Sequence, residues 1–159
     1  MKKYRVFIII AIVLLILPFS VTIGDFSFTT KYYTSPAKAF NAESPHSRTY
    51  GWVEVHKELG TVMLDDKTGL FLGEFEDNHF LIAKMSVKNG KYFYSGEVIY
   101  YDMSDPDVFY IDQTKCSNGF VKWSVTYSDT KSDKETPPID RVESFVHSSG
   151  NTISLTVYK

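Results

Sequence analysis

Histidines and clustered aspartates are the side chains that could bind a metal ion in this chain. None of the four histidines lies two or four positions from another, whereas zinc sites usually include one such close pair. Asp102, Asp105 and Asp107 form the densest acidic group, and oxygen-rich loops of this kind can hold calcium. The loop lacks the glycine and distal glutamate of an EF-hand, so we predict that it caps backbone amides and that the chain binds no metal. The histidines are His46, His56, His79 and His147.

Serines and paired carboxylates could support hydrolysis. A serine nucleophile needs a histidine base and an oriented carboxylate, and the Gly-x-Ser-x-Gly turn that often presents one is absent. Glycosidic bonds are cleaved by two carboxylates, for which the chain offers Glu54, Glu74, Glu76, Glu97 and Asp112. Strand carboxylates are more often solubilising, and no glycine-rich phosphate loop is present. We therefore expect a non-enzymatic protein without a cofactor, with an envelope hydrolase using Glu74, Glu76 or Glu97 as the alternative.

Aromatic residues are the remaining candidates for a binding surface, since they make up 16% of the chain. Strands favour them, and core packing explains most of their positions. One or two exposed aromatic faces would still suit a sugar or peptide, because the polar tips of Tyr and Trp find partners in water. The candidate ligand-binding residues are Trp52, Tyr92, Tyr94, Tyr101 and Trp123.

An uncharged apolar run from Val6 to Gly24 is long enough to cross a bilayer as a helix. Lys2, Lys3 and Arg5 precede it, and the first acidic residue, Asp25, follows it. The positive-inside bias then places the N-terminus in the cytoplasm and the C-terminal body outside the cell membrane. We predict a single-pass protein whose membrane contact is residues 6–24.

Cleavage of this segment is the alternative. The basic start and short apolar stretch also fit a signal peptide, with Thr22 and Gly24 as the small residues before a cut at Asp25. In that case the protein would be secreted. Cys116 is the only cysteine, so an exported domain would have no internal disulfide. We expect Cys116 to be a small, partly buried residue, with an intermolecular disulfide or a reactive thiol as the alternative.

The charge of the exported part argues against nucleic acid as a partner. Residues 25–159 carry 14 basic and all 19 acidic side chains, a net charge of −5, because three of the 17 basic residues precede Gly24. A nucleic-acid-binding domain would instead present a basic patch. The remaining partner classes are an extracytoplasmic protein and an envelope polymer.

The chain divides into an N-terminal signal-anchor (1–24), a linker with a short helix (25–48) and a β domain (49–159). Ser35 followed by Pro36 predicts a helix from Pro36 to Glu43, with Ala37, Ala39 and Phe40 against a sheet. From Thr49 onward apolar and polar residues alternate with period two, separated by turn residues. The predicted strands are 52–56, 61–64, 70–76, 80–87, 92–101, 108–111, 120–128, 139–147 and 152–158.

The pattern predicts a mainly β fold of roughly eight strands, since 108–111 is short, arranged as an antiparallel sandwich or a small barrel, with one transmembrane helix and one short helix. Asn89-Gly90 fits a type I′ hairpin turn. The run from Tyr92 to Tyr101 is apolar on both faces, so we predict a central strand, with either a bulge or close packing at Gly96. The segment 129–138 is polar and predicts an exposed loop.

The N-terminal anchor and the Ser35, Pro36, Ala39 and Phe40 pattern, together with the strand 121–125, resemble small, uncharacterised, membrane-anchored extracytoplasmic proteins of Firmicutes. The resemblance implies a location and transfers no catalytic residue. Our expectation is a tethered module that binds a partner protein or a cell-envelope component. A structural subunit of a membrane complex, packed through Ala11, is a further alternative.

Overall fold

The computed structural model describes residues 30–43, 46–47, 49–104, 110–127 and 138–159. The chain divides into two compact units, Met1–Lys31 and Tyr32–Lys159, and every element described below belongs to the second. Among the described residues, no helix has the length and apolar character needed to cross a bilayer. The predicted membrane segment at 6–24, Ala11, Asp105, Asp107 and most of the loop 129–138 lie outside them.

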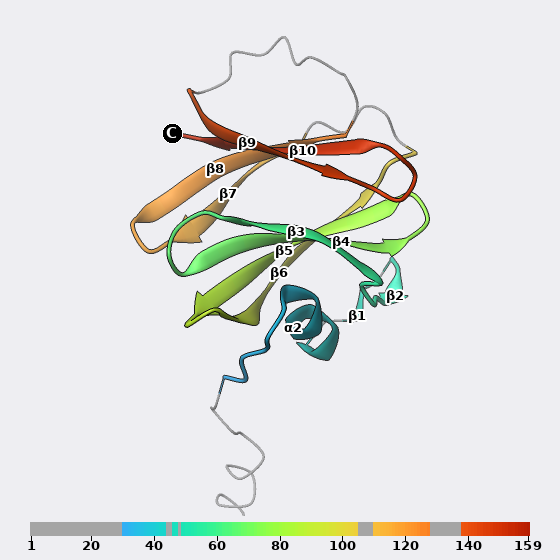
Figure 1. Ribbon diagram of the computed structural model, residues 1–159, viewed down its shortest axis with the longest axis horizontal. Helices are drawn as coiled ribbons and strands as arrows, with labels where there is room; N and C mark the ends of the chain where they lie inside the picture. The colour runs from blue at the N-terminus through green and yellow to red at the C-terminus, as the bar shows by residue number, and fades with distance from the viewer. Residues whose placement is uncertain (1–29, 44–45, 48, 105–109, 128–137) are drawn as a thin grey trace, which may run out of the picture. The chain divides into compact units, whose positions relative to one another are not determined.

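The second unit contains two antiparallel four-stranded sheets (Figure 1). The first sheet has the order β3-β4-β5-β6, and the second has the order β7-β8-β10-β9. The sheets are separate, which decides between the two predicted architectures in favour of a sandwich. The first sheet comprises β3 (Lys57–Met63), β4 (Thr68–Glu76), β5 (His79–Lys88) and β6 (Lys91–Asp102). The second comprises β7 (Tyr110–Cys116), β8 (Gly119–Thr126), β9 (Ile139–Val146) and β10 (Thr152–Tyr158).

The turns follow the predicted local chemistry. Asn89 and Gly90 have φ values of 52° and 69°, as a type I′ turn requires, so this prediction is confirmed. The carboxylate of Asp65 accepts hydrogen bonds from the amides of Lys67 and Thr68 and so closes the β3–β4 turn. The β9–β10 hairpin also lies where its sequence indicated.

The space between the sheets holds one hydrophobic core. Alternate residues of β8 and β10 point into it, because side chains on a strand alternate between faces. The period-two alternation predicted for 120–128 and 152–158 is confirmed, because Trp123, Val125, Ile153 and Leu155 are buried. The core includes Leu70, Leu72, Phe80 and Ile82 from the first sheet and Trp123, Val125, Ile153 and Leu155 from the second.

A second core lies between the other face of the first sheet and helix α2 (Figure 1). Helix α2 spans Pro36–Glu43, as predicted. The side chain of Ser35 accepts a hydrogen bond from the amide of Lys38 and caps the helix. Ala39 and Phe40 are fully buried against the sheet, and the rings of Phe40 and Tyr94 meet edge to face at 5.2 Å. The predicted docking of the helix is therefore confirmed.

The prediction of a strand at 52–56 is wrong, but the predicted alternation of buried and exposed side chains in this segment is confirmed. Only Gly51–Trp52 forms a strand, β2, which pairs with β1 (His46–Ser47). Val53 and Val55 are buried and their neighbours exposed, yet the segment is not a strand of either four-stranded sheet, and the amide of His56 donates to the carbonyl of Glu74 in β4 at 2.9 Å. Asn41 of the helix instead holds the backbone of Val55, donating to its carbonyl at 3.1 Å and accepting from its amide at 2.9 Å.

The prediction that the run 92–101 is a central strand is also wrong, because β6 is at the edge of the first sheet and β4 and β5 are central. Its second face is apolar because α2 covers it, and its first residues are protected by an antiparallel bridge between Tyr33 and Tyr92. The bulge at Gly96 is confirmed. Ala83 pairs with Val98 and Met85 with Tyr94, so Lys84 alone faces residues 95–97.

Candidate functional site

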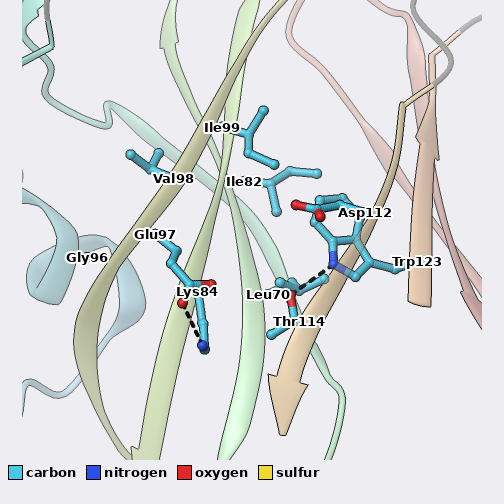
Figure 2. Close-up of a pocket in the computed structure, with 10 residues that line it drawn as sticks. All are labelled: Leu70, Ile82, Lys84, Gly96, Glu97, Val98, Ile99, Asp112, Thr114 and Trp123. Atoms are coloured by element: carbon cyan, nitrogen blue, oxygen red, sulfur yellow. Dashed lines mark hydrogen bonds and ion pairs between the residues drawn. The ribbon is translucent and has the colours of Figure 1, made fainter. Parts of the chain in front are cut away.

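A cleft of about 290 Å³ opens between the sheets at the β6 and β7 edges (Figure 2). Its floor is apolar and includes Leu70, Ile82 and Trp123. Its rim is charged and includes Lys84 and Glu97 from the first sheet and Asp112 from the second. A hollow that combines apolar side chains with a few convergent polar groups is a possible form of a small-ligand site.

The strand register explains why charged side chains occupy positions between the sheets that are apolar elsewhere. Across the first sheet, Val62 pairs with Leu70 and Leu70 with Lys84, so a row that is apolar in β3 and β4 becomes charged in β5. Lys84 points between the sheets because it lies two residues from Ile82 on the same face. Asp112 stands opposite Trp123 in the same way at the edge of the second sheet.

One wall of the cleft is a closed ion pair. Nζ of Lys84 lies 2.8 Å from Oε1 of Glu97, and the two side chains are 16% and 63% exposed. The Gly96 bulge brings them together, because Oγ of Ser95 donates to the carbonyl of Lys84 at 3.0 Å and fixes the bulged loop. The positive charge of Lys84 is thus committed to Glu97.

The opposite wall is fixed by β7 and β8. The buried indole Nε1 of Trp123 donates to Oγ1 of Thr114 at 3.0 Å, which holds the ring in one orientation. Oδ1 of Asp112 accepts the amide of Gln113 at 2.7 Å. Figure 2 shows Asp112 and Trp123 facing the Lys84–Glu97 pair across the cleft. No cation of the described residues is paired with Asp112 within 4 Å.

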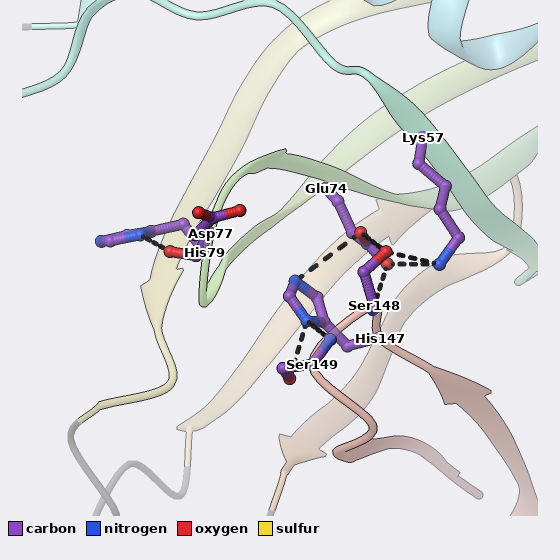
Figure 3. Close-up of polar contacts among 7 residues, drawn as sticks. All are labelled: Lys57, Glu74, Asp77, His79, His147, Ser148 and Ser149. Carbon is purple, nitrogen blue, oxygen red and sulfur yellow. Dashed lines mark hydrogen bonds and ion pairs between the residues drawn. The ribbon is translucent and has the colours of Figure 1, made fainter.

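A second polar group joins the two sheets at one end of the sandwich (Figure 3). Oε1 of Glu74 accepts from Nζ of Lys57 at 2.8 Å and from the amide of Ser148 at 2.9 Å, and Oε2 accepts from Oγ of Ser148 at 2.6 Å. Burial would raise the pKa of Glu74, but these hydrogen bonds outweigh it and hold the pKa below its usual value. We call these three residues the Glu74 network.

Asp65 makes the corresponding link beyond the opposite end of β4. Its Oδ2 accepts the amide of Ser117, in the β7–β8 turn, at 2.7 Å. Burial again opposes ionisation, but hydrogen bonds from Ser117, Lys67 and Thr68 lower the pKa of Asp65 to about 2. Both ends of the sandwich are therefore closed by an ionised carboxylate.

Ser149, His147 and Glu74 contain the residue types of a serine-nucleophile site but not its geometry. The amide and Oγ of Ser149 lie 3.1 and 2.9 Å from Nδ1 of His147. Because an amide only donates, Nδ1 is the acceptor and the neutral ring carries its proton on Nε2. Nε2 lies 3.9 Å from Oε2 of Glu74, beyond hydrogen-bond distance. The amides of Ser149 and Gly150 donate to His147 itself, so neither can stabilise an oxyanion.

The five aromatic candidates do not form one surface. Tyr101 and Trp123 are buried in the core between the sheets, and Tyr94 is buried beneath α2. Tyr92 is partly buried beside the bridge to Tyr33, and Trp52 is 78% exposed in β2. Trp123 is the one of the five that lines the cleft.

The other predicted groups serve local structure. Asp102 accepts the amide and hydroxyl of Ser104, the capping role predicted for this loop. Cys116 is partly buried, as predicted, and burial raises the pKa of its thiol. Within the described ranges, no three His, Cys, Asp or Glu side chains come together to hold a metal ion.

Sequence reasoning considered Glu97 and Asp112 only as hydrolytic carboxylates and missed Lys84. The available signal was a lysine inside the otherwise apolar run of β5, which indicates a charge on a buried face. Neither protein-family models, nor curated proteins, nor solved structures give a significant match to this chain. Function must therefore be inferred from the cleft and its residues.

Proposed function

We propose that this chain is a membrane-tethered extracytoplasmic binding module, without catalytic activity of its own, that holds a partner protein or envelope component in the cleft between β6 and β7. The observation that carries this proposal is the cleft itself, with its apolar floor and charged rim. The tether is the uncharged segment 6–24 behind three basic residues.

Binding is favoured over hydrolysis because the candidate carboxylates are already engaged. Glu97 is paired with Lys84, and Glu74 is held by Lys57 and Ser148. Glu76 is exposed and separated from Glu74 by an irregularity in the β4–β5 register. A general acid needs a raised pKa, whereas the pKa of Glu74 is lowered.

Site-specific photo-crosslinking in cells tests the binding role. An aliphatic diazirine residue at Ile99, on the cleft-facing side of β6, should give a reproducible crosslinked product in membranes. The same residue at Val142, on the outer face of the second sheet, is the matched control and should give none. Protease digestion of the product separates a protein partner from an envelope polymer. A product from position 142 with none from position 99 would contradict the cleft as the binding site.

The intact mass of the mature protein tests the tether. With a tag after Lys159, an uncleaved anchor predicts the full-length mass in the membrane fraction. Loss of the first 24 residues would show a secreted form instead. The two experiments are independent, because a cleaved protein would still crosslink through its cleft.

A further inference from the structure

The charge balance of the cleft is uneven. Its rim carries one cation, Lys84, and two carboxylates, Glu97 and Asp112. Lys84 and Glu97 neutralise each other at 2.8 Å, which leaves Asp112 on the opposite wall without a countercharge among the described residues. An empty cleft of this kind presents a net negative charge to a ligand.

The surroundings strengthen this preference for a cation. A charge acts over a longer range where apolar walls exclude water, because the effective dielectric constant is lower there. The floor of the cleft is formed by Leu70, Ile82 and Trp123, each at most 2% exposed. Residues 25–159 also carry an excess of five acidic over basic side chains, 19 against 14, which disfavours approach by anions.

The size of the cleft limits the uncharged part of the ligand that carries the charged group. A hollow of about 290 Å³ accommodates a short side chain or substituent but not a folded element. The partly buried side chain of Ile99 in the lining rewards burial of methylene groups, which hold the charged end near the rim.

We propose that the cleft between β6 and β7 selects a protonated primary amine on a short alkyl stem, with Asp112 as its counter-ion and the partly buried Ile99 against the stem. This inference rests on the proposed binding function and names the chemistry that the cleft recognises. A lysine side chain of a protein and an amine-bearing substituent of an envelope polymer share that chemistry. Anions are disfavoured because Lys84 is paired with Glu97 and Asp112 would repel them.

The two tryptophans of the chain provide an internal control for a binding experiment. The full-length chain, labelled with ¹⁵N at the indole and purified in detergent micelles, should give two indole N–H resonances. Titration with N-acetyl-lysine methylamide should shift the Trp123 resonance saturably and leave that of Trp52 in place. The neutral analogue N-acetyl-norleucine methylamide should bind at least about tenfold more weakly, and glutarate should have no effect.

Matched variants then assign the counter-ion. D112N should weaken binding of the lysine derivative about tenfold, a difference of the size expected for one partly desolvated charge pair. D140N removes an exposed aspartate of β9 and should leave the affinity unchanged. An unshifted Trp52 resonance and an unchanged urea denaturation midpoint in ligand-free D112N confirm that the fold is retained.

The outcomes separate this inference from the proposed function. Equal binding of the neutral analogue, or an unchanged affinity in D112N, would overturn the amine assignment but keep the cleft as a binding site. If no probe shifts the Trp123 resonance, the amine assignment is overturned as well. The crosslink from position 99 does not depend on ligand charge, so only its absence bears on the binding function.

Discussion

The two sheets differ in how many of their faces are buried. The first sheet has the inter-sheet core on one face and α2 with residues 53–55 on the other. Eight of the nine residues of β4 are therefore buried. The second sheet has the same core on its inner face, but Val142 and Val146 on its outer face are 53% and 64% exposed.

This difference shows that a strand's apolar content reports the layers around it and not its place in the sheet. β6 is apolar on both faces although it is an edge strand, because α2 packs over it. β10 is central in the second sheet yet alternates, because only one of its faces meets the core. The contrast also predicts where substitutions will be costly.

Truncation of the helix that covers the first sheet should have the largest effect. Phe40→Ala removes a fully buried ring between α2 and the sheet, and we expect a loss of about 3–5 kcal/mol of unfolding free energy. Urea denaturation measures it. A loss below about 1 kcal/mol would mean that the helix does not form a second core.

The Glu74 network should come next, because it joins the two sheets directly. Glu74→Gln replaces a carboxylate that accepts three hydrogen bonds, one of them from Lys57, and should cost about 2–3 kcal/mol. Glu76→Gln, at an exposed position on the same strand, is the matched control and should be nearly neutral. Equal denaturation midpoints for the two variants would contradict a linking role.

Residues 53–55 pack so closely against the first sheet that adding one methyl group at Gly73 should destabilise the domain. A Cβ at this position would lie 2.7 Å from Cγ1 of Val55 and 2.9 Å from Cζ of Phe71. Gly73→Ala should therefore destabilise the domain by about 2 kcal/mol through overpacking. The double variant Gly73→Ala with Val55→Ala should recover part of that loss in thermal unfolding. If it recovers nothing, the two positions are not in contact.

Acid should weaken the links between the sheets. The folded pKa of Asp65 is about 2, below the ordinary value of 3.8, so its ionised form contributes stability that is present above about pH 4 and lost as the pH falls toward 2. Asp65→Asn should lower stability at pH 7 by about 1 kcal/mol and flatten the pH dependence between 4 and 2. Asp66→Asn, at the exposed neighbour, should keep the wild-type slope.

The smallest effect should lie on the outer face of the second sheet. Val142→Ser changes an exposed side chain and should alter the unfolding free energy by less than about 0.5 kcal/mol. A loss comparable to that of Phe40→Ala would show that this face is covered in solution.

Local signals in the sequence predicted most elements of the fold. Ser35 and Pro36 indicated the helix, Asn89-Gly90 the hairpin, and Ile153, Leu155 and Val157 the inner face of β10. The strand β3 begins at Lys57 and not at Thr61, because pairing with Glu74 and Gly73 continues past an irregularity near Gly60. Tertiary pairing, which no local pattern records, set that boundary.

The candidate site was less predictable because its residues meet across two sheets. Lys84, Glu97 and Asp112 come from three strands. They line one cleft because β5 and β6 are neighbours in the first sheet and the edge strand β7 of the second sheet packs opposite them. Ser148 and Glu74 are 74 residues apart in the chain and meet at one end of the sandwich. Trp123 was among the predicted binding residues, but its neighbours in the cleft depend on the packing of the sheets.

The order of strands in the first sheet has a consequence for folding kinetics. Each of its strands pairs with the strand that follows it in the chain, so residues 57–102 form a meander of short-range contacts. Low contact order favours fast folding, and N-terminal segments are synthesised first. We expect the first sheet to form before the second, so that the second sheet assembles on an existing template.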